Sequence, residues 1–152
     1  MSLLRPLAVS KDTVFKVVTR FHKIVFDLSK GRLTGKASGM PVVKLTTIGR
    51  RSGQPRSTML TSPLHDDDRV VLVASYGGDD RDPMWYSNLV ANPDVDVTMN
   101  GSTRAMRARV AEGDERTQLW EELTARHDNY AGYQRKTARQ IPVVVLEPRS
   151  AK

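Results

Sequence analysis

The sequence predicts an α+β fold, mainly β, in which about six mostly antiparallel strands form a small barrel with peripheral helices. Three observations carry this prediction. Short β-rich runs recur between turn residues, one pair of runs is joined by Asn100-Gly101, and two further stretches show helical periodicity. The 152 residues, 39% of them hydrophobic and 27% charged, fit one domain with a buried core.

The strands are expected between residues 42 and 146. Proline cannot donate a ladder hydrogen bond, so Pro63 should mark an edge or a bulge. Residues 65–68 are predicted as a polar turn, and Asn-Gly is the strongest short hairpin signal. The predicted strands cover 42–48, 56–64, 69–75, 95–99, a return strand ending near Val110, and 141–146.

Helices are predicted on both sides of the hairpin. Asp82 suits the cap of the first helix and Pro83 its first position, and Asn92-Pro93 ends it. A second helix over 114–127 should direct its apolar side chains, Leu119, Trp120 and Leu123, inward. A short helical turn containing Tyr130 and Tyr133 follows.

Residues 11–29 predict a further, amphipathic helix, because apolar residues repeat there at spacings of three and four. Lys16, Arg20 and Lys23 occupy its other side. Such a helix packs on a core or lies on an anionic membrane, and both interpretations stay open. With a loop over 31–40, the chain divides into an N-terminal helix and linker (1–40), a barrel domain (41–148) and a tail (149–152).

Composition excludes several classes of function. The chain has no cysteine, which excludes disulfides, thiolate chemistry and Cys-ligated metals, and His22, His65 and His127 lack metal-ligand spacing, so no metal site is predicted. No nucleophile elbow, Walker sequence or dinucleotide fingerprint is present, and the carboxylates form no acid/base pair. No apolar run reaches the ~18 residues of a membrane span, and the N-terminus lacks a signal-peptide core, so a cytoplasmic protein is expected.

The net charge of +7 indicates an anionic partner or simple solubility. The most informative basic stretch is the turn from Gly49 to Arg56, called here the arginine turn. Glycines let backbone amides face an anion, and arginines donate in pairs to phosphate. The donors are Arg50, Arg51, Ser52 and Arg56. This pattern favours a phosphate site over an ordinary basic turn, and without interleaved aromatics a nucleic-acid partner is not expected.

Four blocks of the sequence resemble the deazaflavin (coenzyme F420)-dependent nitroreductase family. They are LTTIGRRSGQPR at 45–56, VASYGG at 73–78, PMWYSNLVANP at 83–93, and the tail YAGYQ through IPVVVLEP at 130–148. The resemblance implies a split β-barrel like those of flavin reductases and FMN-binding proteins. It also implies that 41–148 binds F420, whose phosphodiester and poly-glutamate tail are anionic, in agreement with the arginine turn.

The resemblance further implies a role for each matching residue. The arginine turn would hold the phosphate and tail through Arg50, Arg51, Ser52 and Arg56. The ring would lie against Met59, Leu60, Ala74, Ser75, Gly77, Gly78, Trp85 and Asn88. The acceptor would be oriented by hydroxyl groups of Ser75, Tyr130 and Tyr133. The structural alternatives are core packing for Trp85, a helix-end hydrogen bond for Asn88 and helix packing for the two tyrosines.

The implied activity is hydride transfer from reduced F420 to a small planar acceptor: a quinone, a nitroaromatic or an enone. An FMN-binding reductase on the same barrel and a non-catalytic deazaflavin-binding protein are the alternatives. Thr61 and His127 stand where the nitroimidazole-reducing member of the family has tyrosines, which implies weak activation of bicyclic nitroimidazoles. A quinone acceptor would give the N-terminal helix a purpose at the membrane, and split barrels often form homodimers.

Overall fold

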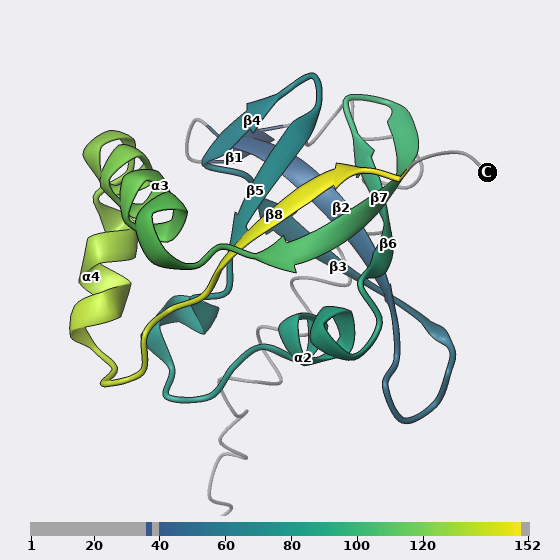
Figure 1. The fold of residues 1–152 in the computed structure, drawn as a ribbon, viewed down its shortest axis with the longest axis horizontal. Helices are drawn as coiled ribbons and strands as arrows, with labels where there is room; N and C mark the ends of the chain where they lie inside the picture. Colours follow the sequence, from purple (N-terminus) through teal and green to yellow (C-terminus); the bar gives the residue numbers. More distant parts are fainter. Residues whose placement is uncertain (1–35, 38–39, 150–152) are drawn as a thin grey trace, which may run out of the picture.

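The computed structural model of the chain describes residues 36–37 and 40–149, which form a single antiparallel sheet with helices around it (Figure 1). The predicted helix over 11–29 lies outside the described residues. Within the predicted linker, β1 (Lys36–Ala37) is already a strand, and it pairs with the start of β2 (Met40–Ile48). The division of the chain at residue 41 stays a prediction.

The remaining strands are β3 (Pro55–Thr61), β4 (Leu64–Asp66), β5 (Arg69–Val73), β6 (Asp94–Met99), β7 (Ser102–Val110) and β8 (Val143–Pro148). Their order in the sheet is β1-β2-β6-β7-β8-β5-β4, and β3 pairs with β2. Along this path β3 and β4 are not paired, so the sheet of the described residues does not close on itself. The mainly β, antiparallel split-barrel prediction is confirmed, with eight strands rather than about six because β1 and β4 are very short.

The predicted strand over 56–64 is wrong at its C-terminal end. The chain leaves β3 after Thr61 and begins β4 at Leu64, with Pro63 between the two strands. Buried Ser62 holds this crossing, because its Oγ lies 2.8 Å from the carbonyl oxygens of both Leu64 and Val71. The predicted turn over 65–68 is correspondingly shorter, since β4 continues to Asp66 before it pairs back onto β5.

The hairpin prediction is confirmed in detail. Asn100 (φ 52°) and Gly101 (φ 80°) both have positive φ, the requirement of a type I′ turn, and the flanking residues Met99 and Ser102 are paired.

Among the described residues, three helices and one 3-10 turn accompany the sheet: η1 (Tyr76–Gly78), α2 (Met84–Ala91), α3 (Gly113–Arg126) and α4 (Asn129–Arg135). The prediction that Asp82 caps α2 is wrong. The N-cap residue is Pro83, without a side-chain capping bond, and Asp82 Oδ1 instead accepts a hydrogen bond from Arg139 Nη1 at 3.1 Å. None of the described helices is long and apolar enough to cross a membrane.

Two buried clusters fill the two faces of the sheet. Val70 and Leu72 of β5 belong to one cluster, with Trp85 and Leu89 of α2, whereas Val71 belongs to the other. The second cluster contains Leu119 and Leu123 of α3 and Tyr130 of α4, so α2 and the α3–α4 pair cover different faces (Figure 1). Because β5 is buried on both faces, its sequence is a continuous apolar run rather than an alternating one.

Candidate functional site

The arginine turn joins β2 to β3 and is closed by its own backbone. Gly49 N–H donates to Gln54 O and Gly53 N–H donates to Gly49 O, each at 2.8 Å. Ser52 Oγ accepts from Gln54 N–H at 3.2 Å, and a Cβ on Gly49 would lie only 2.5 Å from that oxygen. This compact turn leaves the predicted phosphate-binding side chains exposed: Arg50, Arg51, Ser52 and Arg56.

Asn88 of α2 anchors the arginine turn from the side. Its Oδ1 accepts hydrogen bonds from Arg50 N–H (3.2 Å) and Arg50 Nη1 (3.1 Å), and its Nδ2 donates to Thr47 Oγ1 at 3.3 Å. Asn88 is only 5% exposed. Its side chain therefore fixes the turn and directs Arg50, instead of ending the helix. Among the described residues, Arg51 and Arg56 form no ion pair, so their charge is available to an anion.

The second part of the predicted cofactor site, after the arginine turn, is the segment 74–82, which follows β5. Tyr76 (φ 46°), Gly77 (φ 64°) and Gly78 (φ 86°) are consecutive residues with positive φ, which reverses the chain sharply. The two glycines differ in surroundings. A Cβ on Gly77 would meet open space, whereas a Cβ on Gly78 would lie 2.8 Å from Tyr133 O and 2.9 Å from Lys136 Cβ. Gly78 thus permits close approach of α4, whereas Gly77 is exposed with open space beside it.

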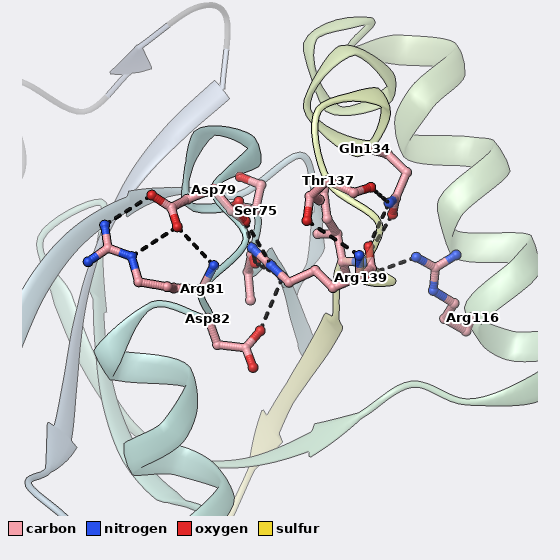
Figure 2. Close-up of polar contacts among 10 residues, drawn as sticks. Ser75, Asp79, Arg81, Asp82, Arg116, Gln134, Thr137 and Arg139 are labelled. Carbon is pink, nitrogen blue, oxygen red and sulfur yellow. Dashed lines mark hydrogen bonds and ion pairs between the residues drawn. The ribbon is translucent and has the colours of Figure 1, made fainter.

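Arg139, which the sequence did not single out, holds this segment (Figure 2). Its guanidinium donates to the carbonyl oxygens of Ala74 and Ser75, and further to Asp79 O and Asp82 Oδ1, at 2.9–3.2 Å. Next to it, hydrogen bonds from the Arg81 side chain and backbone lower the pKa of Asp79 to about 2. A single arginine in a loop has no periodicity or motif that would reveal this role.

Tyr130 is the centre of an aromatic cluster on α4. Its hydroxyl lies 3.5 Å from both Thr61 Oγ1 and Met40 Sδ, and its ring meets the rings of His127 and Tyr133 edge to face. Burial raises the pKa of Tyr130, which is 4% exposed. The structure therefore brings together the four residues on which the acceptor prediction depends: Thr61, His127, Tyr130 and Tyr133.

The remaining predicted residues lie in or beside the barrel core. Trp85 and Ala74 belong to the same buried cluster, and Leu60 packs against it, as the core-packing alternative for Trp85 expects. Met59 pairs with Lys44 across β2 and β3 and is half-buried. Ser75 is buried at the start of η1, without a side-chain capping bond. Contacts of these residues with a cofactor ring stay predictions.

The chemistry of the arginine turn fits an anionic cofactor. Comparison with known proteins identifies a family named for such a cofactor. The family model described as F420H(2)-dependent quinone reductase matches residues 18–148. An F420H(2)-dependent quinone reductase of Mycobacterium tuberculosis is 37% identical over 134 residues, covering 86% of this chain and 89% of the relative.

Two solved structures are also similar. An F420-H2 dependent reductase (FDR-A) is 39% identical, with a TM-score of 0.64, and the match covers 70% of this chain and 94% of that one. A domain-swapped dimer is 34% identical, with a TM-score of 0.65, covering 83% and 98%. The chain described here belongs to the F420H(2)-dependent quinone reductase family.

Proposed function

We propose that the chain binds coenzyme F420 and uses its reduced form to reduce a quinone. The observation that carries this proposal is the arginine turn. Three exposed guanidinium groups, those of Arg50, Arg51 and Arg56, lie on one compact turn that Asn88 fixes to α2. A phosphodiester with a poly-glutamate tail is the anionic ligand that such a donor set suits.

Bound in its reduced form, F420 supplies a hydride from its central ring carbon. The chain's own residues then have to hold the cofactor, orient the acceptor and shield both from water. The arginine turn would anchor the charged end, and the backbone of Ala74 to Gly78 would flank the ring, where Gly77 leaves open space. Because hydride transfer needs reacting atoms about 3–3.5 Å apart, the fixed position of these walls matters more than any protein nucleophile.

The aromatic cluster on α4 supports a planar acceptor. The Tyr130 hydroxyl is buried and already near Thr61 and Met40, so its contribution to the acceptor would be through the ring. Tyr133 is half-buried, at the edge of the same cluster, and its hydroxyl is better placed to donate a hydrogen bond to a quinone oxygen. Ser75 would supply a second hydroxyl from the opposite wall.

Titration of the purified chain with F420 tests the proposal. We expect saturable quenching of F420 fluorescence, and oxidation of reduced F420 upon addition of menadione. FMN is titrated in parallel. Tight FMN binding without F420 quenching would replace the proposal with an FMN reductase. Normal F420 binding without turnover of quinones, nitroaromatics or enones would replace it with a binding protein.

A finer proposal concerns the membrane. The basic side of residues 11–29 would contact the anionic membrane in which quinones dissolve. Reversal of charge at Lys16, Arg20 and Lys23 should then abolish sedimentation with anionic vesicles.

A second finer proposal concerns oligomeric state. The chain would form homodimers, as expected from its split barrel, and a relative has been solved as a domain-swapped dimer. Light scattering of the protein as it elutes from a size-exclusion column measures its molar mass and so separates monomer from dimer.

A further inference from the structure

We infer that Arg139 is a positioning residue of this site, which sets the spacing between the ring-side wall and the acceptor-side helix α4. The inference rests on the proposed function, because only a bound ring gives that spacing a catalytic meaning. Arg139 stands between the two quoted parts of the block at 130–148, YAGYQ and IPVVVLEP, and belongs to neither.

The guanidinium of Arg139 is used completely. Nε donates to Asp79 O (2.9 Å), and Nη1 to Ala74 O (3.2 Å) and Asp82 Oδ1 (3.1 Å). Nη2 donates to Ala74 O (3.2 Å) and Ser75 O (2.9 Å). These five hydrogen bonds equal the five N–H groups of an arginine and span the segment 74–82 from end to end. The side chain is 16% exposed, so water competes little for these donors.

The backbone of Arg139 is in turn fixed to α4. Gln134 of α4 donates through Nε2 to Arg139 O at 2.7 Å and accepts through Oε1 from Ile141 N–H at 3.0 Å. Arg139 N–H donates to Thr137 Oγ1 at 3.3 Å. The same helix carries Tyr130 and Tyr133. Arg139 therefore connects the helix of the acceptor side to the segment of the ring side, as Figure 2 shows.

The hydrogen bonds to Arg139 also fix the orientation of two peptide groups in the segment 74–82. The carbonyl groups of Ala74 and Ser75 point at Arg139. Because a trans peptide directs its N–H opposite to its C=O, the amides of Ser75 and Tyr76 are turned away from Arg139. The guanidinium thus fixes the orientation of these peptide groups, so that their N–H groups lie on the side of the segment opposite Arg139. Gly78 adds a second contact between the walls, since its missing Cβ allows Tyr133 O to approach.

A lysine at this position keeps the charge but cannot reproduce the fork. It has three donors on one atom, so it cannot reach Ala74, Asp79 and Asp82 together. We expect Arg139→Lys to leave the chain folded and to let the segment 74–82 shift relative to α4. Misplacement by about 1 Å costs up to roughly 100-fold in rate, so kcat should fall between about 10-fold and 100-fold. The KM for menadione should change by less than about threefold, because uniform binding is retained.

The control variant is Arg104→Lys. Arg104 of β7 is half-buried and also donates to a backbone carbonyl, that of Asp67, but in the turn between β4 and β5. Hydrogen–deuterium exchange of the cofactor-free chains gives a readout independent of activity. Peptides covering 74–82 should exchange faster in Arg139→Lys and unchanged in Arg104→Lys. Guanidinium ion added at millimolar concentration should restore part of kcat to Arg139→Ala and none to Arg104→Ala.

Unchanged exchange over 74–82 in Arg139→Lys would overturn the inference, and so would faster exchange with kcat equal to that of Arg104→Lys. If Arg139→Lys does not fold, Asp82→Ala removes one of the five bonds from an exposed partner, and should produce a smaller effect of the same kind. Failure of the wild-type chain to quench F420 is a different result. It contradicts the proposed function before any variant is compared, and it removes the catalytic role while the exchange data still decide whether the contact fixes the segment.

Discussion

One oxygen atom of Asn88 accepts two hydrogen bonds from Arg50, one from the backbone N–H at 3.2 Å and one from Nη1 at 3.1 Å. The two residues are 38 positions apart in the sequence. Helix α2 is thereby fixed to the arginine turn. The residues just before α2 are fixed from another direction, because Asp82 accepts a hydrogen bond from Arg139. Both proposed sides of the site therefore depend on polar contacts with the segment from 74 to 88.

Asn88→Ala should affect both stability and cofactor binding. Loss of its hydrogen bonds to Arg50 and Thr47 should lower the free energy of unfolding by about 1–3 kcal/mol and weaken F420 binding by roughly tenfold. Denaturant unfolding and fluorescence titration measure the two effects. Asn92→Ala is the matched control, because within the described part of the chain the Asn92 side chain accepts a single, exposed hydrogen bond, from Asp94 N–H. Equal F420 affinities of the two variants would contradict the role given to Asn88.

Replacement of Arg51 and Arg56 together should weaken F420 binding without changing stability. Both side chains are exposed, and each charge-assisted bond contributes about 1.5–3 kcal/mol, so the affinity should fall by at least tenfold. The remaining affinity should depend less on salt than that of the wild type. Arg107→Ala, on the exposed face of β7, tests whether loss of net charge alone has this effect. The same loss in that control would refute the proposed phosphate contact.

The sequence predicted the fold where the pattern was local. The hairpin at Asn100-Gly101 and the helix over 114–127 follow from turn chemistry and periodicity, and both are confirmed. The strand over 56–64 was predicted too long, because the crossing at Ser62-Pro63 depends on a hydrogen bond from Ser62 to Val71 of β5. Asp82 as a helix cap failed for the same reason, since Arg139 competes for its carboxylate.

The site shows the same division. Thr61, His127, Tyr130 and Tyr133 were grouped through family resemblance, and the structure brings them into contact. The role of Asn88 toward Arg50 and that of Arg139 toward the segment 74–82 could not be predicted, because each joins elements far apart in the chain. Neither contact has a spacing that a single sequence reveals.

Gly78→Ala should be more harmful than Gly77→Ala. Both glycines have positive φ, so an alanine at either position costs roughly 1 kcal/mol in backbone strain. At Gly78 the new Cβ also collides with Tyr133 O and Lys136 Cβ, which should add about 1–3 kcal/mol and displace α4 from η1. Thermal unfolding of the two variants isolates the steric part, and equal melting temperatures would contradict the close contact.

Tyr130 should make the chain less stable at alkaline pH. Burial raises its pKa above the ordinary value of about 10, so the folded state retains a proton that the unfolded state releases. Its contribution to stability is complete below pH about 10 and is lost as the pH rises toward the folded pKa. Tyr130→Phe should therefore reduce the alkaline decline in unfolding free energy, while near neutral pH it costs about 1 kcal/mol or less. Parallel alkaline slopes for variant and wild type would show that the phenol is not shielded.

Tyr133→Phe should separate the acceptor from the cofactor. Tyr133 lies at the edge of the aromatic cluster on α4, whereas the proposed phosphate contacts are on the arginine turn between β2 and β3. Loss of its hydroxyl should lower kcat/KM for menadione by about tenfold, one hydrogen bond's worth, and leave the Kd for F420 within about twofold. Tyr86→Phe, a half-buried tyrosine of α2, is the control for removal of a hydroxyl. A larger effect of Tyr133→Phe on F420 affinity than on turnover would place Tyr133 on the cofactor side of the site.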